Sequence, residues 1–449
     1  MGISMERVVR VTGGIPGEGT DPHREYDYFT VDSRETAGHR ALFFAFRGDR
    51  TDAHSYLPQV LSDPQCGAVI DEKEYLSANT VLVPSSRAAL LALASDYRNN
   101  ELRDTVCIGI TGSVGKTTVK EMTMRCVGSG MPVCGTRGNM NSQVGLPRTV
   151  LETMPGIPAA VYEMGMSLPG ELERLTMCAR PDIVIITGIG ASHIEAFGTR
   201  ERIRDEKLTI LRGLRDGGRV IVNGDDPLLS SVDGAVRCGI DNPDNEVYAY
   251  NLRPDGKGTA CTVSLLGEEF ETYIGAVGRH SVVNALLAFA AAHIIGVSTE
   301  KMKDSLGCFT AGGNRMRIVD CDGITVIADC YNSSPEALHA SLGLLAEQSG
   351  RRIAVLGDMF ELGGHSARLH AEAGRRAREC GVDALFCMGE GMLAAAASAG
   401  VPFTMCFPEG CFDRAAEELK KYVRRGDAVL IKGSHGMHLE ILMKKVFGI

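Results

Sequence analysis

The sequence lacks several features that would place it in common classes of protein. It has no excess of positive charge, because 47 Lys and Arg residues against 56 Asp and Glu residues give a net charge of −9. Such a surface does not hold nucleic acid phosphates or anionic lipid, so a phosphate-bearing ligand must meet a local site. No apolar run is long enough to span a bilayer, since the longest, at 285–297, is short and contains His293.

Paired metal-ligand cysteines are also absent. The 14 cysteines are scattered and none forms a C-x-x-C pair, so we predict neither a zinc site nor a disulfide framework. We expect these thiols to pack as small buried apolar side chains. The first residues, MGISMERVVRVTGG, lack the apolar core of a signal peptide, and we expect a cytoplasmic protein without a transmembrane segment.

The remaining composition predicts a folded α/β protein of about three domains. Hydrophobic residues make up 44% and charged residues 23% of the 449 residues, which suits globular folding. Residues 1–103 mix short apolar strands with turns and end in a helix predicted at 87–97. In 104–311 and 312–449, apolar strands alternate with amphipathic helices, including helices predicted at 365–380 and 412–424. Because parallel strands need crossover connections, we predict parallel sheets covered by helices in both later domains.

The strongest local motif is CIGITGSVGKTTVKEM, an apolar strand that runs into a Gly-rich loop and then a helix. This is the context of a phosphate-binding loop, in which backbone amides and the helix N-terminus face an anion. One departure is Ile110, where the generic pattern has glycine. The alternative is a Gly-rich turn that binds nothing. The predicted nucleotide-binding residues are Thr111, Gly112, Ser113, Val114, Gly115, Lys116, Thr117 and Thr118.

Two further side chains stand at the ends of apolar strands, where open α/β sheets place their ligands. AAVYEMG ends in Glu163, and DIVIITGIGASH leads into His193. Either residue alone is most simply a solvated or hydrogen-bonded side chain. Together with a phosphate loop they indicate a Mg²⁺ site, because nucleotide-bound Mg²⁺ takes further protein ligands.

Lys207 lies on the apolar side of a predicted helix. It follows Ile203 by four residues and precedes Ile210 by three, so it shares their inward face. A buried ammonium beside Mg²⁺ would be repelled and costly to desolvate, so its charge would have to change. The alternative is a lysine whose stem covers apolar surface while its ammonium reaches water.

The later motifs contribute candidate contacts. Asn284 stands near the start of an apolar helix, where it is either a capping amide or a base contact. Arg315 stands at a Gly-rich joint and is either an ordinary surface residue or a guanidinium that reaches a transferring phosphoryl group. Two strands end in further polar residues, which are Asp329, Tyr331 and Asn332 after ITVIA, and Lys432 and Ser434 after AVLI.

With these motifs in place, the sequence resembles the Mur ligases, the ATP-dependent amide-bond synthetases of peptidoglycan assembly. The resemblance covers nearly the whole chain. Within the family, E-x-G-x-x-x-x-G-E from Glu163 and G-N-x-N before Gly145 and Pro147 resemble the branch that adds D-Ala-D-Ala. The chain departs from the family's usual motifs with YNSSP for YNANP, Asn141-Ser142 for a pair of asparagines, and Arg279-His280-Ser281 for a usual His-Asn. The segments that carry the resemblance include VDSRETAGHRALFFAFRGDRTDAHSYL, GITGSVGKTTVKEM, GNMNSQVGLPRTVL, EMGMSLPGEL, VIVNGDDP, GRHSVVNALLAFAAA, DCYNSSPEAL, VLGDMFELG and VLIKGSHGMHLE.

The resemblance implies a role for each matching residue. It implies a three-domain architecture with an N-terminal UDP-sugar-binding domain, a central ATP-binding P-loop domain and a C-terminal Rossmann-like domain. The implied catalytic residues are Lys116, Lys207, His193 and Arg315. The implied nucleotide contacts are the loop residues with Asn284 at adenine, Asp329 at ribose and Arg315 at the γ-phosphate. The implied substrate contacts are Ser33, Arg34, Asn139, Asn141, Tyr331, Asn332, Lys432 and Ser434. The implied metal ligands are Thr117 and Glu163 for one Mg²⁺, and His193 with Lys207 as a carbamate for a second.

The implied reaction joins D-Ala-D-Ala to UDP-N-acetylmuramoyl-tripeptide through an acyl phosphate, with ATP and two Mg²⁺, in a protein expected to be monomeric. Three alternatives stay open. One is the sister ligase that adds the third stem residue, and another is a folylpolyglutamate-type ligase, which would lack the N-terminal D-S-R element. The third is a module that binds nucleotide as a switch and forms no amide.

Overall fold

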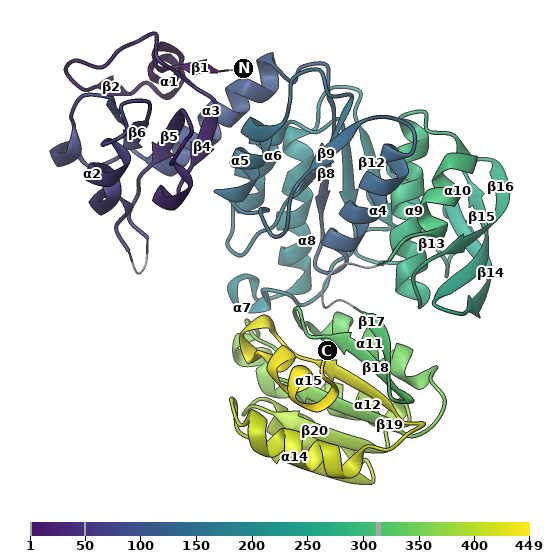
Figure 1. Ribbon diagram of the computed structural model, residues 1–449. Helices are drawn as coiled ribbons and strands as arrows, with labels where there is room; N and C mark the ends of the chain where they lie inside the picture. Colours follow the sequence, from purple (N-terminus) through teal and green to yellow (C-terminus); the bar gives the residue numbers. More distant parts are fainter. Residues whose placement is uncertain (1, 49–50, 311–315) are drawn as a thin grey trace. The chain divides into compact units, whose positions relative to one another are not determined.

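The computed structural model describes residues 2–48, 51–310 and 316–449 (Figure 1). The chain forms two compact units. The first comprises Met1–Thr111, Met131–Ile185 and Glu206–Val220, and the second comprises Gly112–Gly130, Ile186–Asp205 and Ile221–Ile449. No described helix is long and apolar enough to cross a membrane.

The first unit begins with a small α/β layer. Its five-stranded sheet has the order β2 (Ile15–Pro16), β7 (Thr80–Leu82), β6 (Gly67–Ile70), β5 (Ala41–Phe44) and β4 (Tyr28–Thr30). All pairs are parallel except β2 with β7. Beside this sheet stand the short pair β1 (Ile3–Ser4) and β3 (Glu25–Tyr26) and the helices α1 (Met5–Thr12), α2 (Leu57–Val60) and α3 (Ser86–Asn100). The helix predicted at 87–97 is thus confirmed as α3, whose N-cap Ser85 accepts from the amide of Ala88.

Helix α3 is anchored to the later part of the same unit by Arg98. This arginine is only 1% exposed, and its guanidinium donates to the carbonyls of Leu102, Ala179 and Arg180. It also forms a 3.0 Å ion pair with Asp182. Because a buried charge needs such partners, these contacts fix where α3 packs.

The same unit contains the parallel strands that precede the phosphate loop. β10 (Ala159–Glu163) pairs with β8 (Val106–Thr111) on one side and with β9 (Val133–Gly135) on the other, and β11 (Ile183–Ile186) follows β8 in the sheet order. The helices α5 (Gly145–Glu152) and α6 (Glu171–Ala179) belong to this unit, and α8 (Arg200–Leu208) leads into it. Side chains along the three central strands are almost entirely buried, which is typical of parallel sheets covered on both faces.

The second unit adds a strand layer with a different pattern. β12 (Arg219–Asn223), β13 (Val236–Gly239) and β14 (Val247–Asp255) run parallel, but β15 (Gly258–Leu265) and β16 (Glu268–Ile274) continue as antiparallel hairpins. The predicted alternation of strands and helices through 104–311 is therefore wrong for β14–β16. Positive φ at Leu266 and Gly267 allows a tight two-residue turn that joins antiparallel strands without a helix. The helices of this part are α4 (Lys116–Gly128), α7 (Ile194–Phe197), α9 (Arg279–Ile294) and α10 (Thr299–Gly307).

The last part of the second unit is a six-stranded sheet in the order β17 (Arg317–Cys321), β18 (Ile324–Asp329), β22 (Ala428–Lys432), β19 (Arg352–Gly357), β20 (Ala384–Met388) and β21 (Phe403–Phe407). Only β17 is antiparallel, so the predicted parallel sheet is confirmed. The predicted helices are also confirmed, as α12 (Ser366–Glu379) and α14 (Phe412–Tyr422). The other helices are α11 (Pro335–Ala346), α13 (Met392–Ala399) and α15 (Leu439–Phe447), and α14 packs against α15 (Figure 1).

The cysteines behave as the sequence predicts. All 14 are free, and most are buried. Burial raises the pKa of the Cys107, Cys126 and Cys178 thiols to about 12. These three thiols therefore stay protonated near neutral pH and act as apolar packing groups.

Candidate nucleotide-binding site

The predicted phosphate loop has the strand–loop–helix context that the motif requires. β8 ends at Thr111, and α4 begins at Lys116 after Gly115, which has a φ of 85°. A side chain at Gly112 would collide with Thr187. The Lys116 ammonium folds back over the loop and donates to the carbonyl of Gly112 at 2.7 Å and of Ser113 at 3.4 Å. The helix N-terminus and this cation together provide an anion-binding position.

The segment that follows β11 braces the phosphate loop from the side. The amide of Ser113 donates to the carbonyl of Gly188 at 2.8 Å, and the Thr187 hydroxyl donates to the carbonyl of Val114. The Asn284 side chain on α9 is 8% exposed, and its Oδ1 lies 2.8 Å from where a Cβ at Gly115 would stand. The structure therefore brings the predicted base-contact residue against the predicted phosphate loop.

His193 lies in the same unit, at the start of α7. Its φ is 64°, which is uncommon for a residue other than glycine. Its Nδ1 contacts Oε2 of Glu361, and the hydrogen bond from His193 lowers the pKa of the Glu361 carboxyl. The Ser192 hydroxyl reaches the carbonyl of Ser113 at 3.5 Å, so the segment that carries His193 also touches the phosphate loop.

Asp329 and Lys432 face each other across two paired strands. The register pairs Asp329 on β18 with Lys432 on β22, and the Lys432 ammonium donates to Asp329 Oδ2 at 2.6 Å. Both residues are buried, and the ammonium also donates to the carbonyl of Asn332 at 3.0 Å. The carboxylate further accepts from the Ser341 hydroxyl at 2.7 Å and from the amide of Met316 at 3.2 Å. A contact of Asp329 with ribose stays a prediction.

The remaining predicted substrate residues of this unit lie at the same end of the β22 sheet. The Ser434 hydroxyl accepts from the amide of Phe360 at 2.9 Å. The exposed Tyr331 ring lies 5.8 Å from the ring of His435, centroid to centroid. Side chains predicted from separate motifs are thus gathered beyond the carboxyl ends of parallel strands, where such sheets bind ligands.

His280, whose pKa is affected by the charges of Asp329 and Lys432, should make the stability of the unit depend on pH. Burial lowers its pKa to about 4, against a smaller opposing effect of Asp329. Below the ordinary pKa of about 6.5 the unfolded chain binds more protons, so stability is full above that pH and falls as the pH drops toward about 4. Urea unfolding should show a loss on the order of 3 kcal/mol across this window that His280→Gln removes. His23→Gln, on an exposed ring, should leave the slope unchanged, and equal slopes in both variants would contradict this account.

In the first unit, Glu163 ends β10 and is 2% exposed. Its Oε1 accepts from the Asn141 amide at 2.8 Å, and its backbone amide donates to the Thr136 hydroxyl at 3.0 Å. The carbonyl of Asn139 accepts from the amide of Asn141 at 2.8 Å. The G-N-x-N loop therefore packs directly on the Glu163 carboxylate. A predicted substrate contact, Asn141, thus lies beside a predicted metal ligand, Glu163.

Lys207 is 2% exposed, which confirms that it lies on the inward face with Ile203 and Ile210, both fully buried. The alternative of a lysine with its ammonium in water is therefore wrong. A long cationic side chain at this depth needs compensation or a change of charge.

The N-terminal candidates occupy a turn of the first unit. Ser33 is buried at the start of a 3₁₀ turn, whereas the Arg34 side chain is 86% exposed and pairs with Asp32 at 2.6 Å. Nearby, Asp52, His54 and Glu72 form a group with the spacing of metal ligands. His54 is buried with Nδ1 2.7 Å from Asp52 and Nε2 accepting from the amide of Asp71 at 3.3 Å. Both ring nitrogens of His54 therefore have protein partners, and the implied place of the loop Asp52-Ala53-His54 at the nucleotide-sugar end stays a prediction.

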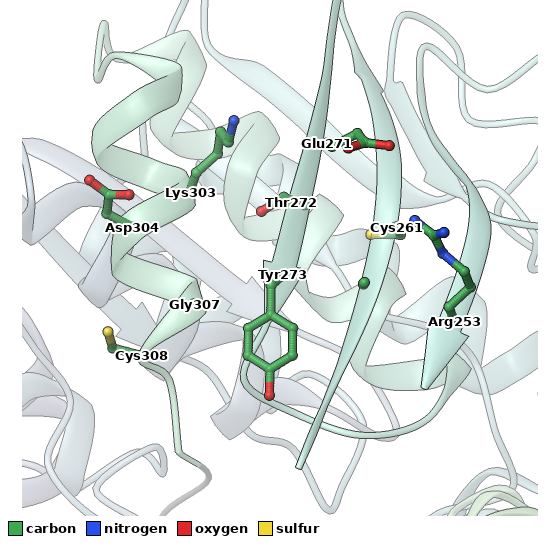
Figure 2. A pocket seen from close by; sticks show the side chains of 10 residues that line it. Arg253, Cys261, Glu271, Thr272, Tyr273, Lys303, Asp304, Gly307 and Cys308 are labelled. Carbon is green, nitrogen blue, oxygen red and sulfur yellow. The ribbon is translucent and has the colours of Figure 1, made fainter. Parts of the chain in front are cut away.

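The hollow between α10 and the β14–β16 hairpins has a volume of about 550 Å³. Figure 2 shows Lys303 and Asp304 on the helix, Cys308 just after its end, and Glu271, Thr272 and Tyr273 on the strand beside it. None of its lining residues belongs to the phosphate loop or carries a predicted role.

Arg315 lies outside the described residues. Two other residues were missed by the sequence motifs, namely Glu336 and Glu361. Glu336 Oε1 accepts from the amide of Ala191 at 2.8 Å, and Glu361 contacts His193. Glu361 follows the strand RIAVLG, so a search of every strand end for carboxylates would have found it.

Comparison with known proteins covers almost the whole chain. The Mur ligase middle domain matches residues 110–292, and the Mur ligase, glutamate ligase domain matches residues 314–435. The UDP-N-acetylmuramoyl-tripeptide–D-alanyl-D-alanine ligase of Bacillus subtilis (strain 168) is 33% identical over 449 residues, with 95% of each chain covered.

Two solved structures are similar to this chain over most of its length. MurF from Acinetobacter baumannii matches with a TM-score of 0.92 and 26% identity, covering 100% of this chain and 99% of that one. The MurF ligase from Thermotoga maritima in complex with ADP matches with a TM-score of 0.85 and 25% identity, covering 94% and 97%.

Proposed function

The chain belongs to the Mur ligase family, and we infer that it is the ATP-dependent ligase that joins D-Ala-D-Ala to UDP-N-acetylmuramoyl-tripeptide in peptidoglycan synthesis. The observation that carries this inference is the phosphate loop, with Lys116 folded over it and Asn284 against Gly115. The likeness to D-Ala-D-Ala ligases over 95% of the chain supports the branch.

The reaction couples two nucleophilic steps. The terminal carboxylate of the tripeptide attacks the γ-phosphorus of ATP, which gives an acyl phosphate and ADP. The amine of D-Ala-D-Ala then attacks the acyl carbon, and the resulting tetrahedral intermediate releases phosphate while the amine nitrogen loses a proton. Such chemistry depends on positioning and on offsetting negative charge, and Lys116 provides a cation at the loop for the terminal phosphates.

We propose that Thr117 and Glu163 hold one Mg²⁺, and that His193 and Lys207, the last as a carbamate, hold a second. These donors fit Mg²⁺, because the set offers hydroxyl and carboxylate oxygens and an imidazole, and the Asn141 amide orients the buried Glu163. When bound, the metal neutralises charge on the phosphates. Two metal positions, the nucleotide contacts of Asn284, Asp329 and Arg315, and the substrate contacts at Ser33 and Arg34 are parts of the same proposal.

We further propose that the chain divides at 103/104 and 311/312 into UDP-sugar-binding, ATP-binding and C-terminal domains. A monomeric state and a cytoplasmic location remain predictions.

The proposed reaction is tested by measuring ADP release with UDP-muramoyl-tripeptide and a panel of amines. Release should require ATP, the tripeptide and D-Ala-D-Ala together, and a peptide product should form in equal amount. Activity with the dipeptide form and a single amino acid would instead assign the sister branch. Nucleotide binding without any amide product would assign a switch module.

The carbamate at Lys207 gives a second prediction. Because the buried side chain must lose its positive charge to support a cation, removing dissolved CO₂ should lower the rate by about 10-fold or more, and added bicarbonate should restore it. Carbon-13 bicarbonate should give a carbamate signal in the NMR spectrum that Lys207→Arg abolishes. A wild-type spectrum without that signal would contradict the prediction.

A further inference from the structure

The segment that carries His193 is held from the last part of the chain by two glutamates. Glu361 contacts His193 Nδ1 through its side chain, and its backbone carbonyl accepts from the amide of Glu195 at 3.2 Å. His193 and Glu361 both have left-handed backbones, with φ of 64° and 62°. Residues other than glycine keep such conformations where surrounding contacts fix them, so this pairing is built into both segments.

A second contact fixes the same segment two residues earlier. Glu336, in the first turn of α11, accepts from the amide of Ala191 at 2.8 Å. A Cβ at Gly190 would come within 2.5 Å of the Glu336 carboxylate, so only glycine leaves room for this approach. A Cβ at Gly363 would likewise stand 2.9 Å from the Glu195 side chain. The turn bearing His193 is therefore fitted closely against residues near 336 and 361–363.

We propose that Glu361 is a positioning residue that orients His193 for Mg²⁺. A carboxylate that accepts the Nδ1 proton selects one tautomer of the imidazole and leaves the lone pair of Nε2 for a metal. The inference rests on the proposed role of His193 as a metal ligand. It extends that role, because the last part of the chain then contributes to the metal site through a hydrogen bond without supplying a ligand.

Glu195 provides the comparison within the same turn. It lies two residues from His193 and is exposed. Among the described residues its carboxylate accepts no hydrogen bond, so its charge is nearby but does not orient the ring. Glu195→Gln therefore changes the local charge by the same amount as Glu361→Gln and leaves the imidazole contact in place.

The experiment measures Mn²⁺ binding by electron paramagnetic resonance in the full-length protein with a non-hydrolysable ATP analogue. Glu361→Ala should weaken Mn²⁺ binding by about 10- to 100-fold, the usual effect of removing the carboxylate behind a metal-bound histidine. Glu361→Gln should have a smaller effect because the amide oxygen still accepts a hydrogen bond, and it serves if the alanine variant fails to fold. Glu195→Gln should bind Mn²⁺ like the wild type.

The His193→Ala variant distinguishes the role of His193 as a metal ligand from the role of Glu361 in orienting it. It should weaken Mn²⁺ binding, and the double variant with Glu361→Ala should be no weaker than His193→Ala alone, because both changes act on one group. Normal Mn²⁺ binding in Glu361→Ala and Glu361→Gln, with weakened binding in His193→Ala, overturns the positioning role and leaves the metal role of His193 intact. Normal binding in His193→Ala overturns the proposed ligand set itself. Additive losses in the double variant show that Glu361 acts apart from His193 and also overturn the proposal.

Discussion

Lys116→Ala should lower kcat for ligation by about 10³-fold, comparable to the loss of a principal charge-stabilising group in other active sites. The reason is geometric as well as electrostatic. The ammonium is held over the loop by the carbonyls of Gly112 and Ser113, so it stands ready where the terminal phosphates would lie. Because those phosphates gain charge on their oxygens during transfer, the loss should fall mainly on kcat and less on the KM for ATP.

The rate is followed as ADP release in the presence of UDP-muramoyl-tripeptide and D-Ala-D-Ala. Lys301→Ala is the matched control, since it removes an exposed lysine of the same unit. Near-normal ligation by Lys116→Ala would refute the proposed role of the loop. ADP release that does not depend on the muramoyl peptide would refute the acyl-phosphate scheme.

Asp329→Ala should destabilise the protein by about 3–5 kcal/mol, because it leaves the buried Lys432 ammonium without its carboxylate. That ammonium is 1% exposed and donates to Asp329 at 2.6 Å. The Ser341 hydroxyl and the amide of Met316 would lose the same acceptor. Asp329 can hold Lys432 and also contact ribose. Only its contact with Lys432 predicts a large loss of stability in Asp329→Ala.

Urea unfolding measures this effect. The double variant Asp329→Leu with Lys432→Met removes both charges and should recover part of the lost stability, since an apolar pair of similar size replaces a buried ion pair with little cost. Asp413→Ala, which removes the exposed ion pair with Lys445, should change stability very little. If Asp329→Ala behaved like Asp413→Ala, the buried pair would not be a stabilising contact.

The sequence predicts the parts of this protein that local patterns control. The phosphate loop follows from the order of strand, glycines and helix, and the burial of Lys207 follows from its spacing to Ile203 and Ile210. The β15–β16 hairpin was missed because its turn uses Leu266 at positive φ, and leucine gives no turn signal. The β14–β15 hairpin was missed as well, although Asp255 at the end of β14 and the following Gly256 form a recognisable turn signal.

Contacts between distant segments were out of reach for a different reason. The pairing of Asp329 with Lys432 depends on β18 and β22 being neighbours, which is a property of strand order and leaves no mark on either motif. Glu361 and His193 are likewise 168 positions apart, and nothing local in VLGDMFELG indicates a histidine partner. The spacing of apolar and polar residues predicts individual helices and strands. Predicting which side chains meet across a sheet also requires the order of its strands.

The contacts of Arg98 limit which segments can be exchanged between this enzyme and its relatives. Its guanidinium belongs to α3, yet its acceptors stand at 102 and at 179–182. A chimera that exchanges residues 1–103 with a relative would move Arg98 and its acceptor Leu102 but leave the acceptors at 179–182 behind. An exchange of the N-terminal segment between such enzymes therefore also requires that residues 179–182 come from the same donor or match its sequence.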